Sequence, residues 1–142
     1  MGISIHKTRG SIVGAVIEVF MDTSGILTLN KAWIAIDCGK VINPDTVRAQ
    51  MEGGFTFGLS AALGEEITLK DGRVEQSNFH DYPVARLNQM PELFVHIVDS
   101  NAPPGGIGEP GVPPVVPSIT NAIYHASKTR IRDLPVNKVF SI

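Results

Sequence analysis

Cysteine is almost absent from the sequence, which has one thiol, Cys38, among 142 residues. A single thiol excludes an internal disulfide and a zinc site built from several cysteines. It also excludes an iron–sulfur cluster held by this chain alone, because such clusters usually take four cysteine thiolates. The four histidines show no metal-binding spacing such as His-Glu-x-x-His, so the sequence predicts no metal site made of side chains.

Long apolar runs and an excess of charge of one sign are missing too. No stretch of about 18 apolar residues occurs, so we expect no transmembrane segment. The first residues lack the order of a signal peptide, so we expect no targeting signal in this chain. Twelve Lys and Arg against 14 Asp and Glu leave a formal net charge of −2. This balance gives no reason to expect nucleic acid as a partner.

The apolar residues, 43% of the chain, suffice for one compact domain, which we expect to span residues 1–142. β-Branched and apolar runs predict strands at 11–21, 26–38 and 93–98, and the opening residues 2–6 have the composition of a further short strand. Two shorter runs, 65–69 and 73–76, flank Asp71-Gly72, a dipeptide typical of a type I′ hairpin turn.

Two amphipathic helices are predicted, at 44–63 and 115–128. The first begins at Asn43-Pro44, with Asn as N-cap and Pro at the first helical position. Each glycine inside a helix costs about 1 kcal/mol relative to alanine. We therefore expect a close neighbour along the part of the first helix that holds Gly53, Gly54 and Gly58. Together, the elements predict an α+β fold with a mixed or antiparallel sheet and two amphipathic helices packed on it.

A segment rich in glycine and proline, residues 103–117, separates the last predicted strand from the second helix. It holds six prolines and four glycines but also apolar residues, so we expect a loop of defined shape. Its Gly106–Gly111 stretch has the G-x-G-x-x-G spacing, but no strand precedes it directly, so a dinucleotide-binding turn is not expected.

Two polar residues leave alternatives open. Glu109 is the one charged residue between Asp99 and Lys128, and it is interpreted either as a solvated loop residue or as a base held beside a ligand. Gln50 lies on the glycine-rich helix, away from its apolar stripe, and is either a surface residue or a ligand contact. Cys38 and the histidines are interpreted as structural or surface residues.

Four stretches of the sequence resemble one enzyme family: residues 35–44 (AIDCGKVINP), 50–54 (QMEGG), 57–60 (FGLS) and 106–110 (GIGEP). The chain resembles the C-terminal part of the molybdopterin-binding subunit of the xanthine dehydrogenase and aldehyde oxidase family. The resemblance is greatest to the isoquinoline 1-oxidoreductase β-subunit group and its aldehyde-oxidising relatives. It extends over nearly the whole chain, and the Gly-Glu-Pro motif before an apolar helix is its most specific part.

The resemblance implies a molybdenum hydroxylase that oxidises an aldehyde or an N-heterocycle. The implied cofactor is molybdopterin with molybdenum, in its cytosine dinucleotide form, and no protein side chain binds the metal. Glu109 matches the catalytic base of the family. Gln50, Gly53, Gly54 and Gly108 match positions near the cofactor, and Tyr82 matches, by a weaker alignment, a position near the substrate channel.

The family's subunit is several times longer than this chain. The resemblance therefore implies that the cofactor is shared with a larger molybdopterin-binding polypeptide and that electrons leave through an iron–sulfur subunit. We expect the chain alone to be inactive, as one piece of a split subunit or as a fragment. Assembly in the cytoplasm is expected, with the final compartment, the periplasm included, left open. The alternative is a non-catalytic domain that binds a partner and no cofactor.

Overall fold

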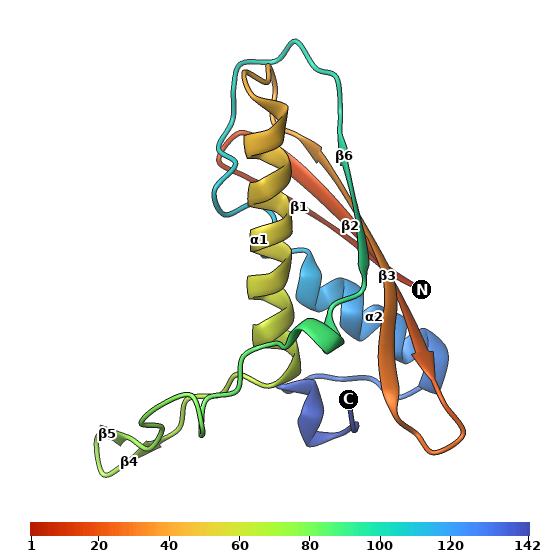
Figure 1. Ribbon diagram of the computed structural model, residues 1–142, viewed down its shortest axis with the longest axis vertical. Coiled ribbons are helices and arrows are strands. Elements are labelled where there is room, and N and C mark those ends of the chain that lie inside the picture. The colour runs from red at the N-terminus through yellow and green to blue at the C-terminus, as the bar shows by residue number, and fades with distance from the viewer.

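The protein, described by a computed structural model over residues 1–142, is built around a four-stranded sheet (Figure 1). The strand order is β1-β2-β3-β6, and β6 pairs parallel to β3 while the other neighbours are antiparallel. The predicted α+β class is confirmed, and of the two sheet types left open, mixed and antiparallel, the sheet is mixed. The strands are β1 (Gly2–Thr8), β2 (Ser11–Met21), β3 (Leu27–Asp37) and β6 (Glu92–Ile97).

Strands β1 and β2 form a tight hairpin that the sequence analysis did not predict. Its two loop residues, Arg9 and Gly10, have φ angles of +49° and +81°. Positive φ at both central positions is the signature of a type I′ turn, whose twist matches that of the strands it joins. The turn fixes the place of Arg9 at one end of the sheet.

Helices α1 (Pro44–Leu63) and α2 (Val115–Ser127) cover one face of the sheet. The Asn43 side chain accepts hydrogen bonds from the amides of Asp45 and Thr46 at 3.0 and 3.3 Å, which confirms the predicted N-cap. Helix α2 is anchored to β2 because the buried Ser118 hydroxyl donates to the carbonyl of Ala15 at 3.0 Å. No helix is both long and apolar enough to cross a membrane.

The core lies between the two helices and alternate residues of β2 and β3. Met51, Phe55 and Leu59, one helical turn apart along α1, are fully buried here. The other largest fully buried side chains are Ile17, Leu27, Ile34, Ile36, Ile119, Ile123, Val13, Val115 and Val136. The opposite face of the sheet carries no helix of this chain.

The glycines of α1 have different neighbours. A Cβ on Gly54 would lie 3.2 Å from the backbone of Gly111, and one on Gly58 would lie 2.9 Å from the carbonyl oxygen of Val112. The expected close neighbour is therefore the glycine- and proline-rich loop of the same chain. Gly53 differs, because a Cβ there would meet nothing within 4 Å.

Residues 65–86 form an arm that projects from the C-terminal end of α1 (Figure 1). It contains β4 (Leu69–Lys70) and β5 (Arg73–Val74), joined by Asp71-Gly72 with φ angles of +49° and +76°, in agreement with the predicted type I′ turn. The two strands are shorter than predicted because they have no core to pack against. Two 3-10 turns, Leu87–Gln89 and Val136–Lys138, complete the chain.

Candidate functional site

The glycine- and proline-rich loop is held to the sheet by backbone hydrogen bonds. The amide of Gly106 donates to the carbonyl of Arg9, and the amide of Gly105 donates to the carbonyl of Cys38, both at 2.8 Å. The buried Ser11 hydroxyl donates to the carbonyl of Gly106 at 2.7 Å. The loop therefore has a defined shape, as its composition predicted, and it lies beside the β1–β2 turn.

Cys38 serves this anchoring through its backbone. Its side chain is buried, and burial raises the pKa of the thiol, so the reactive thiolate is disfavoured. This agrees with the interpretation of Cys38 as a structural residue.

Glu109 occupies the first position of a β-turn within the loop. The amide of Val112 donates to the carbonyl of Glu109 at 3.0 Å, and the intervening Pro110 and Gly111 are buried. Gly111 lies against α1, where a Cβ would be 3.4 Å from the backbone of Met51. The turn thus holds the backbone of Glu109 to the protein while its side chain stays 74% exposed.

Arg9 meets Glu109 across this surface. The Arg9 Nε donates to Oε2 of Glu109 at 3.1 Å, and both side chains are exposed. Arg9 is not among the site residues predicted from the sequence. The signal that could have found it is the Arg-Gly dipeptide between two strand-like runs, since it places the arginine in a tight hairpin turn.

Gln50 joins the same surface from α1. A Cβ on Gly108 would lie 3.8 Å from Nε2 of Gln50, so the amide of Gln50 lies beside the bare backbone next to Glu109. Three of the predicted site residues, Gln50, Gly108 and Glu109, are therefore brought together. They come from a helix and a loop that are more than 50 positions apart in the chain.

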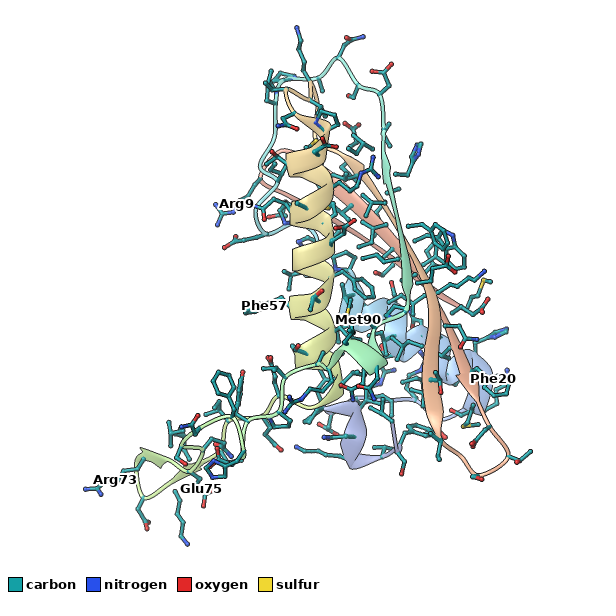
Figure 2. All side chains as sticks on the ribbon, in the orientation of Figure 1. Arg9, Phe20, Phe57, Arg73, Glu75 and Met90 are labelled. Carbon is teal, nitrogen blue, oxygen red and sulfur yellow. The ribbon has the colours of Figure 1, made fainter.

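The exposed face of α1 continues this surface. Residues three and seven positions after Gln50 share its side of a helix, and they are Gly53 and Phe57, both exposed. Figure 2 shows Phe57 on the same side of α1 as Arg9. We call this the α1 surface: Arg9, Gln50, Gly53, Phe57, Gly108 and Glu109.

Tyr82 is not part of the α1 surface. It lies in the arm, where its hydroxyl donates to Oε2 of Glu65 at 3.2 Å, beyond the C-terminal end of α1. Leu63, the last residue of α1, lies 13 positions after Gln50, or roughly 20 Å along the helix at 1.5 Å per residue. Burial, more than the bond to Glu65, raises the pKa of the Tyr82 hydroxyl. Gly54 lies one helical turn after Gln50, but the loop covers it.

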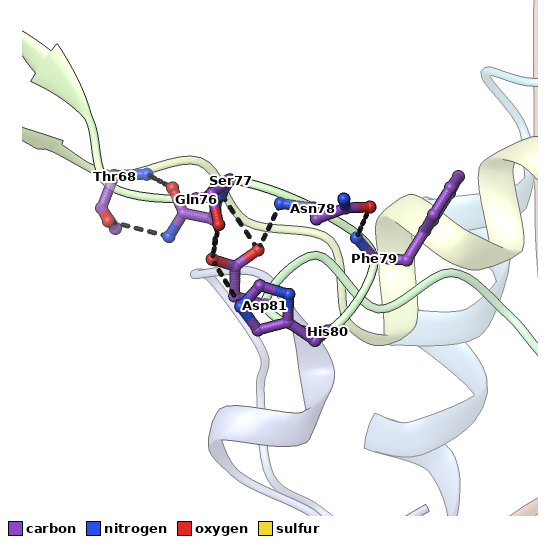
Figure 3. Close-up of polar contacts among 7 residues, drawn as sticks. All are labelled: Thr68, Gln76, Ser77, Asn78, Phe79, His80 and Asp81. Carbon is purple, nitrogen blue, oxygen red and sulfur yellow. Dashed lines mark hydrogen bonds and ion pairs between the residues drawn. The ribbon is translucent and has the colours of Figure 1, made fainter.

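The neighbour of Tyr82 organises the arm (Figure 3). The carboxylate of Asp81 accepts hydrogen bonds from the amides of Ser77 and Asn78 and from the Ser77 hydroxyl, at 2.9 to 3.0 Å. The amide of Asn78, followed by the groups of Ser77, holds the pKa of Asp81 below its ordinary value. These bonds order the segment without a hydrophobic core.

The α1 surface offers particular chemistry. It holds one carboxylate able to accept a proton, one side-chain amide able to donate hydrogen bonds, and two exposed glycines that allow a flat ligand to approach the backbone. The ion pair between Arg9 and Glu109 is exposed, and such pairs are worth about 0–1 kcal/mol, so a ligand can replace it at low cost. No group of three or more His, Cys, Asp or Glu side chains is placed to hold a metal ion.

Comparison with known proteins identifies the family of this chain. Residues 9–91, more than half of the chain, match the molybdopterin cofactor-binding domain family. The isoquinoline 1-oxidoreductase subunit beta of Brevundimonas diminuta is 36% identical over 137 residues, which are 96% of this chain and 18% of the relative. The membrane-bound aldehyde dehydrogenase of Gluconacetobacter polyoxogenes, whose name specifies pyrroloquinoline quinone, is 38% identical over 85% of this chain and 16% of the relative.

A solved structure shows the same fold. Quinoline 2-oxidoreductase from Pseudomonas putida 86 superposes with a TM-score of 0.78 at 22% identity, over 89% of this chain and 17% of that chain. The chain thus spans less than a fifth of the length of these three proteins.

Proposed function

Since the chain belongs to the molybdopterin cofactor-binding domain family, we propose that it supplies one wall of the catalytic site of a molybdenum hydroxylase. In this proposal the wall is the α1 surface, and Glu109 is its general base. The substrate is an aldehyde or an N-heterocycle, in line with the names of the relatives.

The observation that supports this function is the convergence of Gln50, Gly108 and Glu109 on one exposed surface. A general base must lie within hydrogen-bond reach of the proton that it takes. The turn that begins at Glu109 is buried at Pro110 and Gly111, so the backbone is fixed while the carboxylate faces outward. The arrangement suits a base that acts on a ligand brought by another polypeptide.

Each residue of the surface has a separate task. The Gln50 amide would donate a hydrogen bond to the bound cofactor, and the exposed Gly53 and Gly108 would let the cofactor approach the backbone. Glu109 leaves Arg9 and accepts a proton during the reaction. When bound, the molybdenum of the cofactor supplies the two-electron redox chemistry of the hydroxylation.

The remaining parts of the enzyme belong to other polypeptides in this proposal. The chain corresponds to 18% of the Brevundimonas subunit, so more than four fifths of that subunit lies outside the matched part. A larger molybdopterin-binding polypeptide provides them, and an iron–sulfur subunit removes the electrons. The cofactor has the cytosine dinucleotide form, and the complex assembles in the cytoplasm, whatever its final compartment.

The test is the molybdenum content and pterin fluorescence of the complex that is purified natively through this chain. The proposal predicts molybdenum and pterin in the complex, and no oxidation of aldehydes or N-heterocycles by the purified chain alone. A complex with a stable partner but without molybdenum or pterin would contradict it. Such a result would favour the alternative, a domain that binds a partner without catalysis.

A further inference from the structure

The face of the sheet opposite the helices is apolar and open. Ile3 and Ile5 of β1 are 68% and 74% exposed, and Ile12 and Phe94 are also exposed. Phe20, labelled in Figure 2, extends this face toward the β2–β3 turn. Contiguous apolar patches of this kind on soluble proteins mark sites of interaction.

The strand register arranges these side chains in rows that cross the sheet. One row is continuous and apolar across all four strands, and it consists of Ile3, Val16, Trp33 and Phe94. Within it, the rings of Trp33 and Phe94 stack with their centroids 5.8 Å apart. The neighbouring row on the side of the β2–β3 turn is charged and contains Glu18, Lys31 and Glu92. Nζ of Lys31 lies 3.7 Å from Oε2 of Glu92. The apolar row therefore has a polar border.

The row on the other side of the apolar row forms a shallow trough. Its central members are Gly14 and Ala35, which pair with each other, flanked by Ile5 and His96. A hollow of about 260 Å³ lies here, lined by residues of both rows. The hollow is present because Gly14 and Ala35, at its base, have almost no side chain to fill it.

Neither the backbone conformation nor the packing of this chain requires glycine at position 14. It lies inside a strand, where glycine is unfavourable, and its φ angle is not in the left-handed region. A Cβ there would meet only the carbonyl oxygen of Ser4, at 3.8 Å. Glycine in a strand interior often marks the close approach of another backbone. Apart from Ser4 and the residues next to Gly14 in the chain, no backbone of this chain lies within 4 Å of that Cβ position.

We propose that this face, the Ile3–Phe94 row with the Gly14–Ala35 trough, is the docking surface for an apolar segment of the larger molybdopterin-binding polypeptide. The proposal rests on the proposed function and adds a second contact, on the side of the sheet away from the α1 surface. In each of the three similar proteins, the segment that matches this chain is less than a fifth of one long polypeptide. The rest of that polypeptide is several times larger than the matching segment, so it is large enough to cover an apolar face. The centre of the face has no charge, which fits an apolar occupant.

Cysteine protection tests the docking surface directly, because the one natural thiol is buried. Three single variants are labelled with a maleimide, first in the chain alone and then in the natively purified complex: Ile5→Cys on the docking surface, Phe57→Cys on the α1 surface, and Ala126→Cys on the exposed side of α2. We expect Ile5→Cys to react in the chain alone and to lose its labelling in the complex. Ala126→Cys should react in both.

The outcomes separate the two proposals. If Ile5→Cys stays reactive in the complex while Phe57→Cys is protected, the docking surface is wrong and the proposed function stands. If Ile5→Cys is already protected in the chain alone, a second copy of this chain covers the face, and the docking proposal is overturned. If no complex with a molybdopterin-binding polypeptide forms, both proposals fail.

A second variant fills the trough without disturbing the core. Gly14→Leu adds a side chain toward open space, so the chain should keep its fold, as circular dichroism and thermal unfolding would show. We expect loss of the molybdopterin-binding polypeptide from the purified complex. Ala126→Leu is the matched control and should retain it. Retention of the partner at the wild-type level by a folded Gly14→Leu chain would overturn the docking proposal.

Discussion

Arg9 and Glu109, 100 positions apart in the chain, form an ion pair with 3.1 Å between Nε and Oε2. The pair links the turn between the first two strands to the glycine- and proline-rich loop. Both partners are exposed, so the pair is weak and leaves the Glu109 carboxylate accessible. The weakness of the pair matters for the proposed mechanism, because a carboxylate bound tightly to a cation could not take up a proton.

The first prediction concerns the strength of this pair. Exposed ion pairs contribute about 0–1 kcal/mol, so Arg9→Ala should lower the free energy of unfolding by no more than about 1 kcal/mol. Urea unfolding of the chain at low and high salt would measure this, with Lys31→Ala, which removes another exposed pair, as the control. A loss of several kcal/mol would show that Arg9 holds the loop in place by more than this pair.

The two glycines on opposite sides of α1 should respond to alanine in opposite directions. Gly53→Ala meets open space, so it should raise the free energy of unfolding by about 0.5–1 kcal/mol through the lower entropy of the unfolded chain. Gly58→Ala places a Cβ 2.9 Å from the Val112 carbonyl oxygen, and such overpacking costs about 1–3 kcal/mol. Thermal unfolding of the two variants compares them, and equal shifts would contradict the packing of the loop on α1.

Gln50→Ala separates cofactor binding from stability. Because Gln50 is exposed, the substitution should change the free energy of unfolding by no more than about 0.5 kcal/mol. In the proposed function it removes a hydrogen-bond donor to the cofactor, so the proposal predicts a lower molybdenum content per complex. Glu52→Ala, exposed on another side of the same helix, is the control and should keep the wild-type content. Equal molybdenum content in the Gln50 and control variants would reject the role of Gln50.

The order of the arm should depend on pH through Asp81. Hydrogen bonds to the carboxylate lower its pKa in the folded state, so the stabilisation is present above the ordinary Asp pKa and is lost as pH falls through the lowered value. Limited proteolysis of the arm at neutral pH should be faster in Asp81→Asn than in the wild-type chain. Below that lowered value the two should be cut at similar rates, and a difference that persists there would point to another cause.

Much of the fold could be predicted from local patterns. The boundaries of α1 and β2 follow from an N-cap with proline and from a β-branched run, and both patterns involve only neighbouring residues. The parallel pairing of β6 with β3 could not be predicted, because it joins segments more than 50 positions apart. The β1–β2 turn was missed because arginine is rare at positive φ.

The candidate site could be predicted only in part, for a similar reason. The resemblance to a known family identified Glu109 and Gln50, and the structure brings them to one surface. The resemblance also places Gly54 near the cofactor, and this stays a prediction; the loop of the same chain lies directly over Gly54. Arg9 and the apolar far face of the sheet became visible only once the strands were paired.

The replacement of Glu109 by glutamine in the assembled complex tests the central claim most directly. Glu109→Gln keeps the shape of the side chain and removes its basicity. Loss of a general base slows a reaction by about 10²–10⁴-fold, so we predict a fall of this size in the rate of substrate oxidation, with molybdenum content equal to that of the wild-type complex. A glutamine variant that holds full molybdenum and turns over near the wild-type rate would contradict the account.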